Sequence, residues 1–244
     1  MKVDRSAPSR ARCFALVPCA GVGERAGLGA PKQYALIHGR TLVAHTLAAL
    51  AQVPRLQATL VVLAPGDEQF AAQAGELDAG RVWVAHCGGA TRAASVANGL
   101  AELQRRGAAD EDWVLVHDAA RCLLRPAWVE RLIDACRDDA VGGLLALPLA
   151  DTLKQSRADD ATRVQCTLPR GGKWAAQTPQ MFRLGLLRQA LQQAGPQVTD
   201  EASAVEAAGH APRLVPGELE NFKITWPQDL ALAGRLLATR GVGA

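Results

Sequence analysis

The chain has few lysines, few aromatic residues and little excess charge of either sign. Five of its 27 basic residues are lysines, aromatic residues make up 4% of the 244 positions, and the formal net charge is +3. A nucleic-acid-binding surface needs a clear excess of basic residues, so this balance argues against a nucleic-acid partner. In a chain that prefers arginine so strongly, Lys32 and Lys223 indicate positions where an ammonium group is wanted.

Metal-binding and membrane signatures are also missing. The six cysteines show no Cys-x-x-Cys spacing and the five histidines form no His-Glu-x-x-His cluster. Both facts argue against a zinc site, and they favour reduced thiols in a cytoplasmic protein. The apolar stretch that follows the polar tail, residues 1–12, is too short for a signal-peptide core or a membrane span. We therefore expect a cytoplasmic protein without a membrane segment.

What the sequence does contain is a regular alternation of apolar runs and helical patterns. Hydrophobic residues make up 49% of the chain, which is enough for one large α/β domain, placed at 13–240. We expect buried strands at 14–17, 59–63, 82–84, 113–116 and 144–147, and helices at 41–52 and 126–136. The alternation predicts an open, mostly parallel, Rossmann-like sheet with helices on both faces, which binds ligands at the carboxyl ends of its strands.

One segment, 148–169, breaks this pattern. Val164, Cys166 and Leu168 alternate with polar residues, which is typical of a strand, and the polar run 156–160 before them predicts a turn. Together they indicate a β-hairpin arm inserted into the α/β unit. The arm either folds back on its own sheet or covers its apolar face with a second subunit, which would make the protein a homodimer.

The loop from Pro18 to Lys32 carries the strongest functional signal. It follows the first predicted strand and contains four glycines together with Arg25 and Lys32. Glycines let backbone N–H groups converge on an anion, and two cationic side chains suit a polyphosphate. Gly21-x-Gly23-x-x-Ala26 also fits a dinucleotide fingerprint, but the glycines and the proline that follow disfavour the helix which that motif requires. A plain glycine-rich turn remains the other interpretation.

Asp118 is the second strong feature, because it follows the predicted strand 113–116 directly. At that edge of the sheet and opposite a polyphosphate loop, a carboxylate is well placed to hold Mg²⁺. An ion pair with Arg121, or a helix cap, is the structural alternative. We interpret His117 as a packed or hydrogen-bonded side chain rather than an acid–base catalyst.

Three further segments carry weaker signals. The first allows a functional and a structural interpretation, and the other two predict local structure. Gly88-Gly89 and the helix start that follows them either admit a flat ring, with Ser95 on a base edge, or form a simple turn. Thr199-Asp200-Glu201 is typical of a helix N-terminus. Asn221–Thr225 predicts a short strand that places Lys223 and Thr225 on one side.

Taken in order, these segments resemble the bacterial 2-C-methyl-D-erythritol 4-phosphate cytidylyltransferases over about 13–230. The similarity rests on the following motifs: Ala20-Gly21-Val22-Gly23-Glu24-Arg25, Pro31-Lys32-Gln33-Tyr34, Gly88-Gly89 with Arg92 and Ser95, Val116-His117-Asp118-Ala119-Ala120-Arg121, Asp151-Thr152, Arg170, Gln177-Thr178-Pro179-Gln180, Thr199-Asp200-Glu201-Ala202-Ser203 and Asn221-Phe222-Lys223-Ile224-Thr225. The resemblance implies a Rossmann-like nucleotidyltransferase fold and transfer of CMP from CTP to a sugar-alcohol phosphate.

The resemblance also implies roles for individual residues. The catalytic cations would be Arg25, Lys32 and Lys223, and Asp118 would bind Mg²⁺. CTP would be bound by Ala20, Gly21, Gly23, Gly89 and Ser95, with the triphosphate in the glycine-rich loop. The acceptor would be bound by Thr152 and Arg170 from the partner subunit's arm, together with Arg121, Thr178 and Lys223.

The chain departs from the usual family pattern at Cys19, Ala26, Ala90 and Cys122, and around Arg170. Other hypotheses are a ribitol 5-phosphate cytidylyltransferase, which shares the scaffold, and a non-catalytic nucleotide-binding protein of the same fold. An NAD-dependent dehydrogenase fits the motifs poorly.

Overall fold

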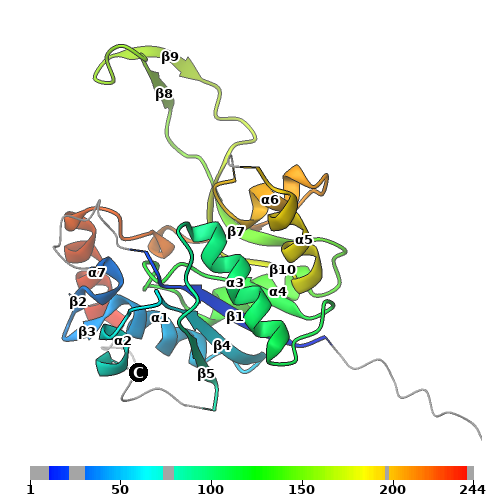
Figure 1. The fold of residues 1–244 in the computed structure, drawn as a ribbon. Coiled ribbons are helices and arrows are strands. Elements are labelled where there is room, and N and C mark those ends of the chain that lie inside the picture. Colours follow the sequence, from blue (N-terminus) through cyan, green and yellow to red (C-terminus); the bar gives the residue numbers. More distant parts are fainter. Residues whose placement is uncertain (1–10, 22–30, 74–79, 196–197, 241–244) are drawn as a thin grey trace, which may run out of the picture.

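The computed structural model describes residues 11–21, 31–73, 80–195 and 198–240. Within these ranges, seven strands form a central sheet in the order β11-β7-β10-β6-β1-β4-β5 (Figure 1). The strands are β1 (Cys13–Pro18), β4 (Leu56–Val62), β5 (Val82–Ala85), β6 (Trp113–Val116), β7 (Gly142–Pro148), β10 (Trp174–Arg183) and β11 (Arg213–Pro216). Only β10 runs antiparallel to its neighbours. The predicted open, mostly parallel sheet is confirmed, including the five strands expected for it at 14–17, 59–63, 82–84, 113–116 and 144–147, whereas β10 and β11 were not predicted.

Helices cover both faces of this sheet because side chains of each strand alternate between the faces. In β1, Ala15 and Val17 pack into a core shared with the helices α1 and α4, while Phe14 and Leu16 join a second core on the opposite face. That second core includes residues of the helices α3, α5 and α6. The bounds are α1 (Leu42–Ala51), α3 (Arg92–Arg105), α4 (Pro126–Cys136), α5 (Leu184–Gln193) and α6 (Glu201–Ala207). The two predicted helices are therefore confirmed.

Six further elements, apart from the hairpin arm described below, complete the described part of the chain. They are η2 (Lys32–Tyr34), β2 (Leu36–Ile37), β3 (Arg40–Thr41), α2 (Gln69–Gln73), η3 (Leu219–Asn221) and α7 (Pro227–Arg240). The predicted strand Asn221–Thr225 is wrong, because η3 ends at Asn221 and the described residues that follow are not assigned to a strand. Ile224 N donates to Ala120 O at 2.9 Å, but this contact with the segment after β6 is not continued as a ladder.

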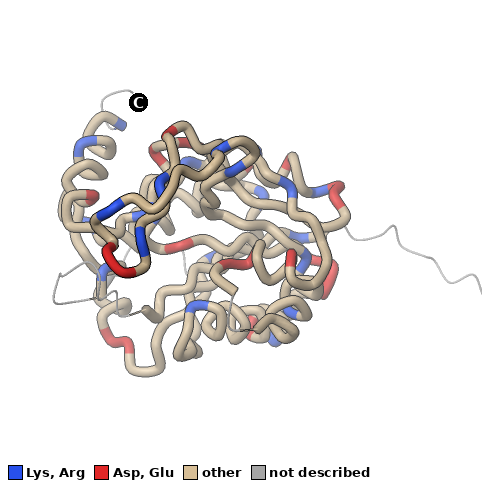
Figure 2. Tube along the Cα trace, turned by 90° about the horizontal axis from the view of Figure 1, so that it is seen from above, with Lys and Arg blue, Asp and Glu red and all other residues tan. Residues whose placement is uncertain are grey.

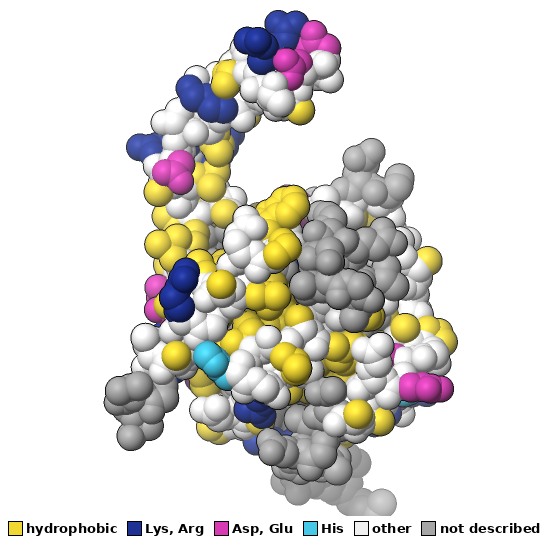
Figure 3. Space-filling view, turned by 90° about the vertical axis from the view of Figure 1, so that its left-hand side faces the viewer, with side chains coloured by type: hydrophobic (Ala, Val, Ile, Leu, Met, Phe, Trp, Pro, Cys, Tyr) yellow, Lys and Arg dark blue, Asp and Glu magenta, His cyan; other side chains and the backbone are white. Residues whose placement is uncertain are grey.

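The hairpin arm projects from the body of the molecule (Figures 1 and 3). Its strands β8 (Leu153–Ser156) and β9 (Val164–Leu168) form a separate antiparallel sheet. Val164 is 59% exposed and Leu168 37%, so the apolar side chains of the arm do not pack on its own central sheet. The predicted hairpin is confirmed, and it does not fold back on its own central sheet; its cover by a second subunit stays a prediction.

The surface carries charges of both signs. Figure 2 shows basic and acidic positions interspersed along the described trace rather than collected on one side. The search of the described residues for a helix long and apolar enough to cross a membrane finds none. All six cysteines are free thiols.

The start of β6 is held by an ion pair between the buried Asp112 and the exposed Arg12. Asp112 is 3% exposed and accepts hydrogen bonds from Arg12 N at 2.8 Å, Arg12 Nη2 at 2.6 Å and Ala109 N at 2.8 Å. Arg12, which the sequence assigns to the polar tail, is thus anchored to the sheet. Burial alone would raise the pKa of the Asp112 carboxyl, but the hydrogen bonds from Arg12 and Ala109 outweigh it and hold the pKa below its ordinary value of 3.8.

We expect Asp112→Asn to lower the free energy of unfolding by about 2–3 kcal/mol at pH 7, because a charge-assisted network loses its acceptor. Since the folded-state pKa is depressed, this contribution is present above about pH 4 and is lost as the pH falls further. Urea unfolding at pH 7 and at pH 3.5 measures both effects. We expect the difference in free energy of unfolding between variant and wild type to be smaller at pH 3.5. Glu111→Gln, at an exposed neighbouring position, is the matched control. An equal deficit at both pH values would contradict the assignment.

Candidate active site

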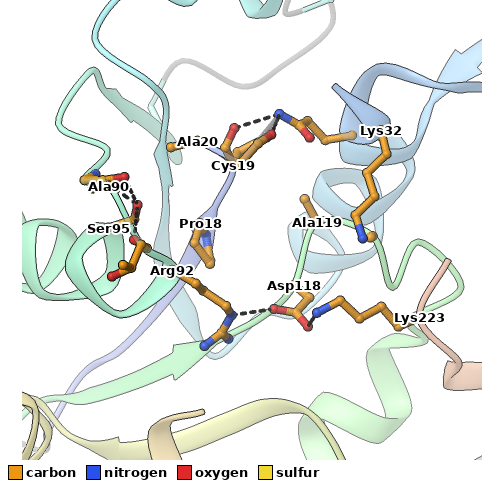
Figure 4. Close-up of a pocket in the computed structure, with 15 residues that line it drawn as sticks. Pro18, Cys19, Ala20, Lys32, Ala90, Arg92, Ser95, Asp118, Ala119 and Lys223 are labelled. Carbon is orange, nitrogen blue, oxygen red and sulfur yellow. Dashed lines mark hydrogen bonds and ion pairs between the residues drawn. The ribbon is translucent and has the colours of Figure 1, made fainter. Parts of the chain in front are cut away.

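A cavity of about 500 Å³ opens at the carboxyl ends of β1, β5 and β6. From β1 the chain proceeds to β4 and β5 on one side of the sheet, whereas β6 lies on the other side of β1. The order of the strands therefore changes direction between β1 and β6, and the cavity lies at the carboxyl ends of strands on both sides of this point, where open α/β sheets bind ligands. Its described lining residues are Pro18, Cys19, Ala20, Gly21, Lys32, Gln33, Gly89, Ala90, Thr91, Arg92, Ser95, Asp118, Ala119, Ala120 and Lys223 (Figure 4).

The cavity brings together most of the residues singled out from the sequence. Seven of them line it, namely Ala20, Gly21, Lys32, Gly89, Ser95, Asp118 and Lys223. Gly23 and Arg25 lie outside the described residues. The described lining does not include Arg121, Thr152, Arg170 or Thr178.

Asp118 is the charged centre of the cavity. Its Oδ1 lies 2.9 Å from Arg92 Nε and its Oδ2 lies 2.7 Å from Lys223 Nζ (Figure 4). Arg121 Nε is more distant, 3.9 Å from Oδ2. Burial would raise the pKa of the Asp118 carboxyl, but Arg92 and then Lys223 outweigh burial and hold the pKa far below its ordinary value. The carboxylate is therefore ionised at neutral pH.

The backbone of Asp118 is held by a hydrogen bond to the side chain of Thr178. Thr178 Oγ1 accepts a hydrogen bond from Asp118 N at 3.1 Å and lies 3.0 Å from His117 Nδ1. His117 Nε2 lies 3.2 Å from Arg121 O, so a neutral ring protonated on Nε2 satisfies all three contacts. Burial lowers the pKa of His117 to about 4. His117 is thus a packed, neutral side chain, as interpreted from the sequence.

Lys32 is placed by the short helix η2. Gln33, 5% exposed, donates through Nε2 to Cys19 O and Gly21 O, each at 3.0 Å, and so fastens η2 to the segment after β1. Lys32 Nζ donates to Ile224 O at 3.2 Å. Figure 4 shows Lys32 and Lys223 reaching the cavity from the same side, across from Ala90 and Ser95.

The opposite end of the cavity is built from small residues. A side chain at Gly88 would collide with Ala20, and a Cβ at Gly89 would lie 2.6 Å from that of Ala94. Ser95 Oγ accepts from Gly89 N at 3.0 Å and lies 3.0 Å from Thr91 O. Thr91 caps α3, which confirms the predicted helix start. The residues at this end have small or no side chains and present backbone polar groups, which suit a flat heterocyclic ring.

The remaining predicted residues that the structure describes are not part of the cavity lining. Thr152 and Arg170 flank the paired residues Leu153 and Leu168 at the base of the arm, and both are exposed. Arg121 donates to Asn221 O at 2.6 Å and to Ala176 O at 3.3 Å, which holds it behind Asp118. Their contact with a substrate stays a prediction.

No catalytic or binding role was predicted for Arg92 or Glu201. Arg92 donates through Nη1 to Glu201 Oε1 at 2.6 Å and through Nη2 to Glu201 Oε2 at 3.0 Å, while its Nε reaches Asp118. Both residues belong to motifs quoted above, but no local pattern in the sequence predicted that they contact each other.

The residues present fit a magnesium ion shared with a phosphate ligand. In the described parts of the chain, no group of three or more His, Cys, Asp or Glu side chains could enclose a metal ion. Mg²⁺ commonly takes one or two carboxylates and completes its shell with phosphate oxygens and water. Asp118 could supply such a carboxylate once Lys223, whose side chain is 37% exposed, moves away from Asp118 Oδ2.

Comparison with known proteins gives consistent results. The family model of 2-C-methyl-D-erythritol 4-phosphate cytidylyltransferase matches residues 13–239. A bifunctional enzyme IspD/IspF of Albidiferax ferrireducens is 61% identical over 95% of the chain, which spans 54% of that relative's length. The 2-C-methyl-D-erythritol 4-phosphate cytidylyltransferase of Paraburkholderia phymatum is 51% identical over 95% of this chain and 99% of its own.

Solved structures agree. A crystal structure of 4-diphosphocytidyl-2C-methyl-D-erythritol synthase superposes with a TM-score of 0.83 at 39% identity, covering 94% of this chain and 100% of the other. The Francisella tularensis 2-C-methyl-D-erythritol 4-phosphate cytidylyltransferase gives a TM-score of 0.77 at 32% identity, covering 92% and 99%. The similarity therefore extends over the central sheet, the cavity and the arm.

Proposed function

The chain belongs to the 2-C-methyl-D-erythritol 4-phosphate cytidylyltransferase family, and on that premise we propose that it transfers CMP from CTP to 2-C-methyl-D-erythritol 4-phosphate. The products are 4-diphosphocytidyl-2-C-methyl-D-erythritol and pyrophosphate. One observation carries the proposal within this chain. Lys32, Asp118 and Lys223 converge at one end of a cavity whose other end is walled by Gly89 and Ser95.

This division of the cavity orients the nucleotide. Cytosine fits the end with small residues, where backbone groups of Ala20 and Gly89 and the hydroxyl of Ser95 can meet its polar edge. The triphosphate then extends toward Lys32, where Arg25 of the glycine-rich loop would add a second cation. The α-phosphorus is left near the charged centre formed by Asp118 and Lys223.

The reaction we propose is an in-line displacement. A phosphate oxygen of the acceptor attacks the α-phosphorus of CTP, a P–O bond forms, and the bond from the α-phosphorus to the bridging oxygen of pyrophosphate breaks. The nucleophile is already an anion, so no general base is needed, and His117 is buried and neutral in this structure. The main difficulty is electrostatic, because two anions must meet and negative charge must move onto the leaving group.

The side chains of the cavity address this difficulty. Lys32 and Lys223 place positive charge where the phosphate groups gather. Asp118 would hold Mg²⁺ together with nucleotide phosphate oxygens, and the chemistry supplied there is neutralisation of phosphate charge. Positioning of the two substrates in one cavity contributes the remaining rate enhancement.

We further propose that the acceptor site is completed by a second subunit. Thr152 and Arg170 lie at the base of an arm that leaves the body of its own chain (Figure 3), and Val164 and Leu168 are exposed on that arm. A homodimer would cover these apolar side chains and would bring Thr152 and Arg170 to the partner's cavity.

The six free thiols support the cytoplasmic location expected from the sequence.

Arg170→Ala is expected to raise the KM for 2-C-methyl-D-erythritol 4-phosphate by about tenfold or more, since a charge-assisted contact to its phosphate is lost. The KM for CTP stays near the wild-type value. Steady-state kinetics with each substrate varied in turn measure the two constants. Arg163→Ala is the control, because Arg163 is also exposed but lies at the far end of the arm. Unchanged kinetics with the sugar phosphate would refute the assignment of Arg170.

The proposed reaction is tested by offering the protein CTP with either 2-C-methyl-D-erythritol 4-phosphate or ribitol 5-phosphate. We expect pyrophosphate release with the first acceptor, at a kcat/KM at least about 100-fold higher than with the second, a preference of about 2.7 kcal/mol. Mass spectrometry of the cytidylylated product identifies the acceptor. A preference for ribitol 5-phosphate would reassign the substrate, and no pyrophosphate with either acceptor would indicate a non-catalytic nucleotide-binding protein.

A further inference from the structure

Glu201 is a buried carboxylate that the reaction described above does not use. It is 1% exposed, stands in the first turn of α6 and is absent from the described lining of the catalytic cavity. The cap of α6 is provided by its neighbour Asp200, whose Oδ1 accepts from Ser203 N at 2.9 Å. The carboxylate of Glu201 is therefore not needed to cap the helix.

Glu201 instead forms a bidentate ion pair with Arg92, through contacts of 2.6 Å and 3.0 Å. A guanidinium held at both terminal nitrogens has its plane and direction fixed. The third nitrogen of this guanidinium, Nε, lies 2.9 Å from Asp118 Oδ1. Glu201 thus reaches the charged centre of the cavity through one intervening side chain.

The position of Glu201 is itself set by the central sheet. Gln180 of β10 is 1% exposed, donates through Nε2 to Asp200 Oδ2 at 2.8 Å and accepts from Ala202 N through Oε1 at 2.8 Å. These two bonds hold the residues on either side of Glu201. The connection from the sheet to Asp118 therefore runs through hydrogen-bonded side chains, of which Gln180, Glu201 and Asp118 are buried and Asp200 and Arg92 are partly buried.

The charges around Asp118 show what Glu201 contributes. Three cations face this carboxylate, namely Arg92, Lys223 and Arg121. Glu201 neutralises part of the positive charge of Arg92. Without Glu201, Asp118 would be the only carboxylate paired with Arg92 and would be attracted to it more strongly. Asp118 would then bind the surrounding side chains more strongly and would be a poorer ligand for a divalent cation.

We infer that Glu201 is a positioning residue that acts through Arg92: it fixes the orientation of the Asp118 carboxylate and offsets the charge of Arg92, so that Asp118 remains able to bind a divalent cation. This inference rests on the proposed function. Asp118 keeps Oδ1 on Arg92, and Oδ2, which contacts the partly exposed Lys223, is the atom offered to the cation.

The test uses Glu201→Gln, which keeps the shape of the side chain and removes its charge. Calorimetry measures the affinity of the full-length protein for CTP without metal and with Mn²⁺, and the ratio of the two affinities reports the coupling between metal and nucleotide. We expect the variant to lower this ratio about tenfold, in the range found when residues that support metal ligands are replaced. The metal-free affinity of the variant for CTP stays within about twofold of wild type. Its kcat/KM falls about tenfold, as the affinity ratio does.

Glu102→Gln is the matched control. Glu102 is also a buried glutamate, 5% exposed, that pairs with arginines, but these are Arg105, the last residue of its own helix α3, and Arg106 directly after it. This variant loses thermal stability and keeps the wild-type ratio. Glu201→Asp retains the charge with a shorter reach, so its ratio falls between those of wild type and Glu201→Gln, and it carries the test if Glu201→Gln does not fold.

The outcomes separate the inference from the function on which it rests. A wild-type ratio in folded Glu201→Gln or Glu201→Asp, with a loss of stability alone, overturns the inference and leaves the proposed reaction intact. A wild-type protein that releases no pyrophosphate from CTP with either acceptor overturns the proposed function, whatever the ratios show.

Discussion

Lys32→Ala is expected to lower kcat by about 100-fold or more, the loss typical of removing a donor that stabilises a transition state. The ammonium group stands at the end of the cavity where the phosphates gather, on a helix that Gln33 fastens to the segment after β1. Because η2 is held by Gln33, alanine at position 32 removes the charge without releasing the helix. The rate of pyrophosphate release at saturating substrates measures the effect.

Arg188→Ala serves as the control for Lys32→Ala. Arg188 is a surface cation of α5 that pairs with Asp110 and is not part of the described cavity lining. It should retain wild-type kcat. A Lys32→Ala protein with near-normal kcat and a change only in the KM for CTP would show that Lys32 binds the ground state and contributes nothing further in the transition state.

Asp118→Asn is expected to lower kcat/KM by about 1,000-fold, because it removes the one carboxylate of the cavity proposed to hold a divalent cation. The activity that remains should be nearly independent of Mg²⁺ concentration. Titration of the rate with Mg²⁺, for variant and wild type, measures this dependence. A variant that responds to Mg²⁺ as the wild type does would show that the metal is bound elsewhere.

Loss of Asp118 also leaves Arg92 and Lys223 without their common partner, so thermal stability falls as well. Binding of CTP without metal distinguishes this effect from the loss of the metal ligand. Since a negative charge beside the phosphates has been removed, metal-free CTP binds to Asp118→Asn at least as tightly as to the wild type. Weaker metal-free binding would indicate that the cavity itself has been damaged.

The central part of the site could be predicted from the sequence because its signals are local. Lys32 stands at the end of a glycine-rich loop, Gly89 and Asp118 follow recognisable strands, and the carboxyl ends of parallel strands meet at one edge of a sheet. Their convergence therefore follows from the fold class alone. Lys223 was also placed in the site, although the short strand predicted around it is absent.

Other parts of the site depend on contacts that no local pattern encodes. Arg92 and Glu201 are 109 positions apart, and the local pattern around Glu201 was already explained by a helix N-terminus. Thr178 lies on β10, the antiparallel strand that the alternation of strands and helices did not predict. Its hydroxyl supports the backbone of Asp118, which is 60 positions away in sequence. Such pairs are set by the packing of the whole domain.

A crystal structure of the protein with CTP and Mg²⁺ tests the central claim most directly. We expect the triphosphate to lie between the side chains of Lys32 and Asp118, with cytosine against Gly89 and Ser95. Phosphate groups bound elsewhere, with the ammonium group of Lys32 turned away from them, would contradict it.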